Sequence, residues 1–384
     1  MKIAFIDYVL DPARPGASGL SDVVWNMARE LAKLGDDVHI IGPYSVEPPP
    51  VPGVTVHRFK LPPIGYRNIF GHVLIVLAAW RVAHRIPDLD VVHAPEYLTT
   101  GILAPLSRTP IVLTTPGNIY ERVANGNPFD PLTTAVLKVA ARSSARWCRL
   151  IDAISSGMAQ WWMRTGAAPA RIAIIPHGVD TSVFRPIADA KTRLGIAKTE
   201  QTILYAGRLS PEKHVDMLIR LTAHIEQSRA TLHIVGQGPL ESELLRMANE
   251  LCVSDRVRFH GQVALEDMPL WYSATDLMIL PSSSEGLPRV MLEALACGAP
   301  FIGTRISGIV DVIEDGENGL LIDPGDEAAL LTAARSVLND QRFARELGAR
   351  ALSDIRASYS WSSTVHQFRS AVVRETASQP AALV

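Results

Sequence analysis

Hydrophobic residues along the chain alternate between two kinds of segment, short β-branched runs and longer stretches with helical spacing. In the first half, the short runs predict strands at residues 2–7, 38–41, 54–59, 91–93, 111–114 and 150–153. In the second half, they predict strands at residues 202–206, 231–235, 257–260, 276–280, 300–303 and 319–322. Strands that alternate with helices are typical of parallel, doubly wound sheets. We therefore expect an α/β chain with two Rossmann-like domains, residues 1–185 and 186–357.

Composition and charge narrow the class of protein. The chain has 384 residues, a formal net charge of −2 and 3 cysteines, which form no spaced cluster. These values give no reason to expect nucleic acid as a partner, and they predict neither a disulfide framework nor a zinc site. The longest apolar block, residues 73–80, is far shorter than the ~20 residues that span a bilayer. Because the cysteines suggest no disulfide framework, we expect a reducing, cytoplasmic compartment. The N-terminal run breaks at Asp7 and reads as a strand rather than a signal peptide.

The segment PSSSEGLPRVMLEALAC, residues 281–297, combines an apolar helix with a single acid. Pro288 suits the first helical position, and apolar residues then cover the circumference except at Glu293. Burying a lone carboxylate costs on the order of several kcal/mol unless hydrogen-bond donors contact it. The sugar diol of a nucleotide is one such donor, and a core arginine is the alternative. Glu285, in the loop before this helix, is either a second ligand residue or a solvated loop residue.

The segment YAGRLSPEKH, residues 205–214, places cations beside a predicted helix start. Ser210 fits an N-cap and Pro211 the first helical position. Arg208 precedes this end and Lys213 follows it, which is unfavourable by roughly 1 kcal/mol or less unless an anion is bound there. The alternative is that both cations pair with acids such as Glu212.

The E-x7-E spacing within EGLPRVMLEALACGAP resembles the signature of family-4 retaining glycosyltransferases of the GT-B fold. The resemblance implies that Glu293 holds the nucleotide ribose and that Glu285 contacts the donor sugar. It also implies that Arg208 and Lys213 grip the donor diphosphate and act with Glu285 in catalysis. Further donor contacts are expected at turns and loops that match the family, namely Gly16, Gly19, Gly207, Gly236, Gln262, Val263, Gly286 and Leu287.

The sequence departs from the family pattern at two places. Pro288 and Arg289 replace the Gly-Leu of many members, and Pro288 has no amide N–H for one backbone contact to the donor. Many members also carry a His around Pro116 or Gly117, which this chain lacks. Asp88-Leu89-Asp90 matches the metal-binding D-x-D pattern of another glycosyltransferase class, but it precedes its strand and is interpreted as a turn.

Candidate acceptor contacts lie in the first half of the chain. His93 and Glu96 follow a predicted central strand, at the strand end where open α/β sheets bind ligands. Asn118 and Tyr120 follow the next strand. Within the predicted helix 132–147 and just after it, basic residues share one face: Lys138, Arg142, Arg146 and Arg149. This face is either solvated or in peripheral contact with an anionic membrane at its inner side or with an acidic acceptor.

Together these features predict a retaining glycosyltransferase that moves a sugar from a nucleoside-diphosphate sugar to an acceptor hydroxyl on a glycan, lipid or small molecule. The resemblance implies two domains facing each other across a cleft, with residues 358–384 forming a helix that crosses back and a tail. We expect no cofactor and no metal. A sugar-nucleotide epimerase or a phosphorylase is an alternative, which a pyridoxal-binding lysine or hydrolytic products would indicate. A non-catalytic sugar-nucleotide binding protein is another, which tight donor binding without product would indicate.

Overall fold

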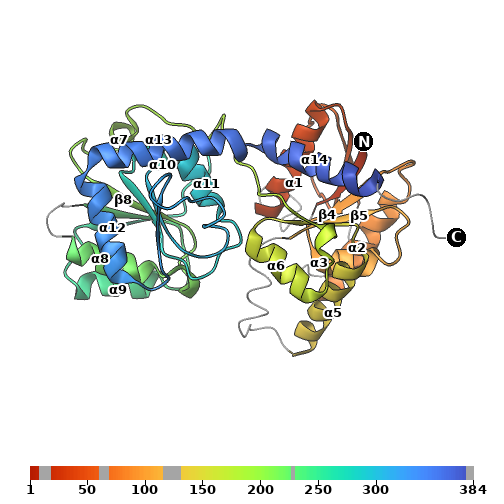
Figure 1. The fold of residues 1–384 in the computed structure, drawn as a ribbon, viewed down its shortest axis with the longest axis horizontal. Coiled ribbons are helices and arrows are strands. Elements are labelled where there is room, and N and C mark those ends of the chain that lie inside the picture. The colour runs from red at the N-terminus through yellow and green to blue at the C-terminus, as the bar shows by residue number, and fades with distance from the viewer. Residues whose placement is uncertain (8–18, 60–68, 116–130, 226–229, 378–384) are drawn as a thin grey trace. The chain divides into compact units, whose positions relative to one another are not determined.

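The computed structural model describes residues 1–7, 19–59, 69–115, 131–225 and 230–377 (Figure 1). The chain divides into two compact units. Unit 1 comprises Met1–His177 together with the segment that begins at Trp361, and unit 2 comprises Gly178–Ser360. The predicted boundaries, after residue 185 and after residue 357, lie eight residues after the first of these boundaries and three residues before the second.

Unit 1 is built on a parallel sheet of strand order β3-β2-β1-β4-β5-β6-β7. Its strands are β1 (Lys2–Ile6), β2 (Asp37–Gly42), β3 (Val54–Arg58), β4 (Val91–Ala94), β5 (Ile111–Thr115), β6 (Leu150–Ala153) and β7 (Ile172–Ile174). The described helices are α1 (Gly19–Lys33), α2 (Ile69–Ala83), α3 (Tyr97–Leu103), α5 (Pro131–Trp147), α6 (Ser156–Thr165) and α14 (Trp361–Ala377), with a 3-10 turn at Pro169–Arg171.

The helices of unit 1 cover the sheet by burying their apolar stripes. Helix α14 packs against α1 and β6 (Figure 1). Helix α3 packs against α2 and α5 and on β4 and β5, and α2 packs on β2. Phe368 of α14 is fully buried beside Phe5 of β1, with ring centroids 6.4 Å apart. Arg369 adds an ion pair, because its Nε lies 3.0 Å from the buried carboxylate of Asp36. The last described helix of the chain is therefore an integral part of the core of unit 1.

Unit 2 repeats this architecture with a parallel sheet of order β10-β9-β8-β11-β12-β13. Its strands are β8 (Thr202–Ala206), β9 (Thr231–Val235), β10 (Val257–Gly261), β11 (Leu277–Leu280), β12 (Phe301–Thr304) and β13 (Leu320–Ile322). Its helices are α7 (Ala190–Arg193), α8 (Val215–His224), α9 (Glu241–Glu250), α10 (Met268–Ala274), α11 (Arg289–Ala296), α12 (Glu327–Asn339) and α13 (Gln341–Ser358), and a 3-10 turn, η2, spans Pro211–Lys213. The predicted strands agree with those of the structure to within one residue at each end.

Both sheets reverse direction of winding at a central strand pair. In unit 2 the chain winds from β8 outward through β9 to β10, and then returns to β11 on the other side of β8. Helices α8, α9 and α12 pack together, and α10 and α11 pack together with α7 and α13 against them. Open parallel sheets bind ligands outside the carboxyl ends of the strands, at such a switch point. For unit 2 this point lies between the ends of β8 and β11.

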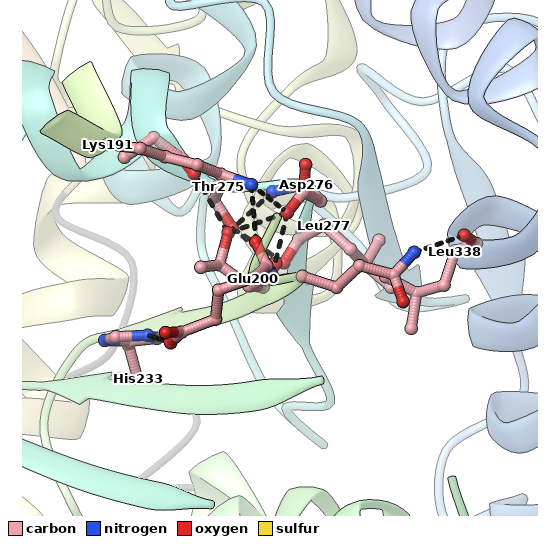
Figure 2. A network of polar contacts seen from close by, with 10 residues as sticks. Lys191, Glu200, His233, Thr275, Asp276, Leu277 and Leu338 are labelled. Carbon is pink, nitrogen blue, oxygen red and sulfur yellow. Dashed lines mark hydrogen bonds and ion pairs between the residues drawn. The ribbon is translucent and has the colours of Figure 1, made fainter. Parts of the chain in front are cut away.

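The opposite, amino edge of β8 and β11 is held by a polar network (Figure 2). Oδ2 of Asp276 accepts hydrogen bonds from the backbone N–H and hydroxyl of Thr202 at 2.8 and 3.0 Å, and from the ammonium of Lys191 at 2.6 Å. A pocket of about 660 Å³ lies beside this network, between the start of α13 and the segment before β8. The network joins the starts of both strands, and so fixes the register at which their carboxyl ends emerge.

Among the residues that the structure describes, no helix is both long and apolar enough to cross a membrane.

Candidate functional site

The predicted donor-binding residues of unit 2 come together at the carboxyl edge of its sheet. Arg208 and Lys213 follow β8, and Glu285 follows β11, so they flank the switch point from either side. Gly236 follows β9 and Gln262 follows β10, at the same edge. Because all these strands are parallel, their carboxyl ends share one edge, and the sequence-predicted set gathers there for that reason.

Glycines let the turns after β8 and β9 approach each other. Gly207 and Gly236 have φ angles of +154° and +136°, which L side chains rarely adopt. A Cβ atom added to Gly236 would lie 1.8 Å from the carbonyl oxygen of Gly207. The hydroxyl of Tyr205, on a fully buried ring, donates to the carbonyl of Arg208 at 2.8 Å and braces the same turn. The backbone at this edge is thus held in a fixed shape.

Lys213 and Glu285 form an ion pair at the switch point. The ammonium nitrogen lies 2.6 Å from Oε1 of the carboxylate, and the two side chains are only 12% and 7% exposed. The buried hydroxyl of Ser282 donates to the same oxygen at 2.7 Å. A charge-assisted hydrogen bond in so dry a place is strong, and it prevents either charge from being buried alone. The sequence analysis predicted the two residues as donor contacts but not their pairing.

The segment that carries Lys213 differs from the predicted helix start. Ser210 occupies an N-cap position, but only the 3-10 turn η2 follows, and α8 begins at Val215. His214 between them has a φ of +47°, so the chain bends at a residue that is not glycine. Ser210 donates its hydroxyl to Glu212 at 2.8 Å instead of capping backbone amides. Lys213 is therefore positioned by a turn, which the Ser283 N–H fixes by donating to the Glu212 carbonyl at 2.9 Å.

Arg208 is exposed at the mouth of this edge. Within the described part of the chain, no carboxylate forms an ion pair with it. The alternative interpretation, in which Arg208 pairs with acids such as Glu212, is therefore not supported, and the exposed guanidinium is accessible to an anion.

Glu293 is buried on α11 beside a tyrosine and an arginine. Tyr272 of α10 donates its hydroxyl to Oε2 at 2.9 Å, and Nη2 of Arg289 lies 3.8 Å from Oε1. The carboxylate is thus partnered within the protein, as the core alternative anticipated, and is still placed one helical turn behind the loop that carries Glu285. Burial, and then the Glu293 charge, raise the pKa of Tyr272 well above its ordinary value, so the phenol stays protonated and donates.

The remaining predicted donor contacts of unit 2 lie on loops around this edge. Gln262 is exposed and Val263 is half-buried directly after β10. Leu287 is buried before α11. Gly286 is packed closely, because a Cβ atom on Gly308 would lie 2.1 Å from its carbonyl oxygen. Pro288 is the N-cap and not the first residue of α11, so the helix begins one residue later than predicted.

In unit 1, His93 is fully buried on β4. Its ring packs 4.8 Å from Phe5 and 5.5 Å from Phe368, and Nε2 lies 2.6 Å from the hydroxyl of Thr114. Thr114 in turn donates to Asp152 at 2.8 Å. Burial lowers the pKa of His93 to about 3, so the ring is neutral. In this structure the His93 ring is a core group without access to an acceptor.

Glu96 is committed to a helix cap. Its carboxylate accepts from the N–H groups of Leu98 and Thr99 at 2.8 and 2.9 Å, at the start of α3. Gly19 is the first residue of α1. The other first-half candidates, Gly16, Asn118 and Tyr120, lie outside the described residues.

The predicted basic stripe of α5 is shorter than expected. Lys138, Arg142 and Arg146 are exposed, but Arg149 is half-buried and donates from Nε and Nη2 to the carbonyl of Glu375 in α14. Arg149 is therefore a structural link to α14 and was wrongly placed in the exposed face. Trp147 is 53% exposed, with the Arg146 guanidinium 5.6 Å from its ring centroid.

Sequence reasoning missed the side chains that support the predicted ones. Ser282 and Tyr272 contact the two key carboxylates from outside the recognised motif. Asp7, directly after β1, was predicted only as a break in the apolar run: it is buried and accepts from Ser21 and Trp25 at 2.8 and 3.0 Å, and from the hydroxyl of Tyr44. Burial raises the pKa of Asp7. An acid at the end of an otherwise apolar first strand was the available signal for this cluster.

No group of three or more His, Cys, Asp or Glu side chains suited to a metal ion occurs in the described ranges. The chemistry available at the edge of unit 2 is instead that of an accessible guanidinium, a half-buried ammonium and two buried carboxylates. Such a set matches an anion that also carries hydroxyl groups.

Comparisons with known proteins identify the family of the chain. The family model described as glycosyl transferases group 1 matches residues 187–354, and the model described as glycosyltransferase family 4 matches residues 17–183. The chain is 30% identical over 388 residues to a D-inositol 3-phosphate glycosyltransferase of Mycobacterium marinum, covering 92% of this chain and 81% of the relative. It is also 30% identical over 386 residues to the protein of that name from Acidothermus cellulolyticus, covering 92% and 85%.

Solved structures share the fold over nearly the whole chain. A sucrose-phosphate synthase from Thermosynechococcus elongatus superposes with a TM-score of 0.83 at 24% identity, covering 98% of this chain and 100% of that one. HepE of Anabaena, solved in complex with UDP-glucose, superposes with a TM-score of 0.76 at 20% identity, covering 97% and 100%.

Proposed function

The chain belongs to the group 1 glycosyl transferases of family 4, and from this premise we propose which residues bind the donor and how they act. As a glycosyltransferase, it moves a sugar from a nucleotide sugar to an acceptor. In our proposal, Lys213 and Arg208 bind the donor diphosphate, Glu285 contacts the sugar and Glu293 holds the ribose. The observation that carries the proposal is the buried Lys213–Glu285 pair at the switch point of unit 2.

The proposed reaction proceeds with retention and requires no metal. The bond between the anomeric carbon and the phosphate oxygen breaks, and the acceptor oxygen forms its bond to that carbon on the same face. The acceptor proton passes to the departing phosphate oxygen. Negative charge grows on the diphosphate as it leaves, so fixed cations at Lys213 and Arg208 stabilise the transition state more than the ground state.

Substitution of Lys213 tests this assignment. Lys213→Ala should lower the rate of sugar transfer by about 10²–10³-fold, the range found when one preorganised charge-stabilising donor is removed. Lys198→Ala is the matched control, since Lys198 is 74% exposed and lies at the amino edge of the sheet. Circular dichroism should show that both variants fold. An unchanged rate in Lys213→Ala would contradict the role of Lys213.

The donor and the acceptor can be identified in two successive experiments. A thermal-shift screen of UDP-, GDP-, ADP- and TDP-sugars identifies the donor, because a ligand that binds only the folded state stabilises it more as its concentration rises above its dissociation constant. The relatives are named for D-inositol 3-phosphate, so a phosphorylated polyol is the first acceptor to test with that donor. The anomeric configuration of the product, read by NMR, tests retention. An assay with and without excess chelator tests independence from metal.

We also propose that the exposed face of α5 contacts an anionic membrane. Lys138, Arg142 and Arg146 supply its positive charge, and Val139 and Trp147, 64% and 53% exposed, add apolar side chains on the same helix. Co-sedimentation with vesicles containing phosphatidylglycerol should exceed that with neutral vesicles. The double substitution Arg142→Gln, Arg146→Gln should abolish the difference. Equal binding to both vesicle types would contradict the proposal.

A further inference from the structure

Tyr272 lies outside the recognised motif but makes direct contact with its second acid. Its hydroxyl donates to Oε2 of Glu293 at 2.9 Å, from α10 to the neighbouring helix α11. The ring is only 1% exposed and packs against Phe184, with centroids 6.2 Å apart. A buried aromatic ring has few accessible rotamers, so its hydroxyl is held at a fixed place.

A glutamate side chain has three rotatable bonds, and its carboxylate must be oriented before it can accept hydrogen bonds from a diol. A donor fixed on one carboxylate oxygen restrains that orientation. The ion pair of Arg289 with the same carboxylate is longer, with Nη2 3.8 Å from Oε1, and the Arg289 side chain is 28% exposed. Tyr272 is thus the closer and less mobile of these two partners.

We propose that Tyr272 is a positioning residue for the ribose of the donor. It holds the Glu293 carboxylate in the rotamer that accepts the two ribose hydroxyls, and so it contributes to selection of a ribonucleotide without touching it. This inference rests on the proposed function, in which Glu293 holds the ribose. The high pKa of the buried phenol keeps it a donor across the working pH range.

The test compares nucleoside diphosphates with and without ribose hydroxyls. The dissociation constants of UDP, GDP and ADP are measured by calorimetry, followed by that of the 2′,3′-dideoxy counterpart of whichever binds. Hydrogen bonds to a charged group predict that the native protein prefers the ribonucleotide by roughly tenfold or more. Tyr272→Phe should lower this preference at least about threefold while leaving the affinity for the dideoxy compound nearly unchanged.

Tyr359→Phe is the matched control, because the Tyr359 hydroxyl also donates within unit 2, to the carbonyl of Asp311 at 2.9 Å. This variant should keep the native preference. Glu293→Gln should lose the preference, and adding Tyr272→Phe to it should cause no further loss, since a positioning residue acts only through its partner.

The outcomes separate the inference from the function on which it rests. If Glu293→Gln loses the preference and Tyr272→Phe keeps it, the role of Tyr272 is overturned and the proposed site remains. If Glu293→Gln also keeps the preference, or if none of the three diphosphates binds, the proposed role of Glu293 fails, and the inference fails with it. A preference lost equally in Tyr359→Phe would show a general loosening of unit 2 and would overturn positioning by Tyr272.

Discussion

Glu285→Gln removes one charge of the buried pair while nearly preserving its shape. The amide oxygen can still accept from Ser282 and Lys213, which lie 2.7 and 2.6 Å from the present carboxylate oxygen. The Lys213 ammonium, 12% exposed, then lacks a counter-charge. Breaking a buried pair by removing one partner costs about 3–5 kcal/mol, and we take about 3 kcal/mol because the hydrogen bond survives. For a unit of the size of unit 2, Gly178–Ser360, the melting temperature of that unit should fall by about 6–12 °C.

On the proposed function, the same change should strengthen binding of the bare nucleoside diphosphate. In the native protein the diphosphate competes with Glu285 for Lys213, whereas in the variant it supplies the missing counter-charge. If most of the about 3 kcal/mol is recovered on binding, the affinity rises by about a hundredfold. Sugar transfer should nevertheless fall, because Glu285 no longer contacts the donor sugar as a carboxylate.

Calorimetry measures the affinity for the nucleoside diphosphate, and differential scanning fluorimetry measures the melting temperature. Glu250→Gln is the control, since Glu250 pairs with Arg246 at 3.8 Å where both side chains are at least 65% exposed. Such a surface pair contributes about 0–1 kcal/mol, so the control should leave both quantities nearly unchanged. A Glu285→Gln protein that binds the diphosphate no more tightly than the native protein would refute competition for Lys213.

Three further predictions concern stability. Burial, and then the charge of His260, lower the pKa of His233 to about 4, below its unfolded value of about 6.5. The unfolded state binds more protons between these two values, so this contribution to stability is full above pH 6.5 and is lost as the pH falls through that window. Urea denaturation at pH 7.5 and 4.5 should show the loss, and His233→Leu should reduce it. Gly236→Ala should destabilise unit 2 by about 2 kcal/mol or more and lower donor affinity, because its Cβ would lie 1.8 Å from the Gly207 carbonyl oxygen. Gly316→Ala is the control: Gly316 also has a positive φ, +82°, but no atom lies within 4 Å of its Cβ position. Its loss of stability therefore measures the cost of the backbone conformation without a steric clash. Arg369→Ala should lower the free energy of unfolding by about 1–2 kcal/mol, and the melting temperature by a few degrees, because it removes a partner of the buried Asp36 carboxylate. An unchanged melting curve would show that the ion pair does not stabilise α14.

The strands were predictable from sequence because parallel strands are buried on both faces and read as continuous apolar runs. β8 and β9 match their predicted ranges, Thr202–Ala206 and Thr231–Val235. The topology then places every predicted donor residue of unit 2 at one edge. The bend at His214 was not predictable, because a positive φ at a non-glycine residue is imposed by tertiary contacts and leaves no mark in the sequence.

The ion-pair and hydrogen-bond partners of charged residues could not be predicted from the sequence either. Glu212, adjacent in sequence, looked like the natural partner of Lys213, yet it accepts from Ser210. Glu285, 72 residues away, is the partner instead. Similarly, the basic spacing of α5 put Arg149 on an exposed face, whereas its guanidinium reaches Glu375, 226 residues away. Spacing along a helix predicts which residues share a face, but it does not predict what packs against that face.

On the proposed function, the two interpretations of Lys213, Glu285 and Glu293, ligand contact or internal pairing, describe two states of one site. Lys213 and Glu285 neutralise each other in a place too dry for either charge alone, and Tyr272 donates to Glu293 in the same way. A donor that brings a diphosphate for Lys213 and hydroxyls for Glu285 and Glu293 exchanges partners without exposing a bare charge at any step. The charged groups are already desolvated in the folded protein, so donor binding does not add that desolvation cost. The binding free energy then depends on the difference between the interactions with the donor and the internal interactions that they replace. Internal pairing at this site therefore preorganises it for the donor.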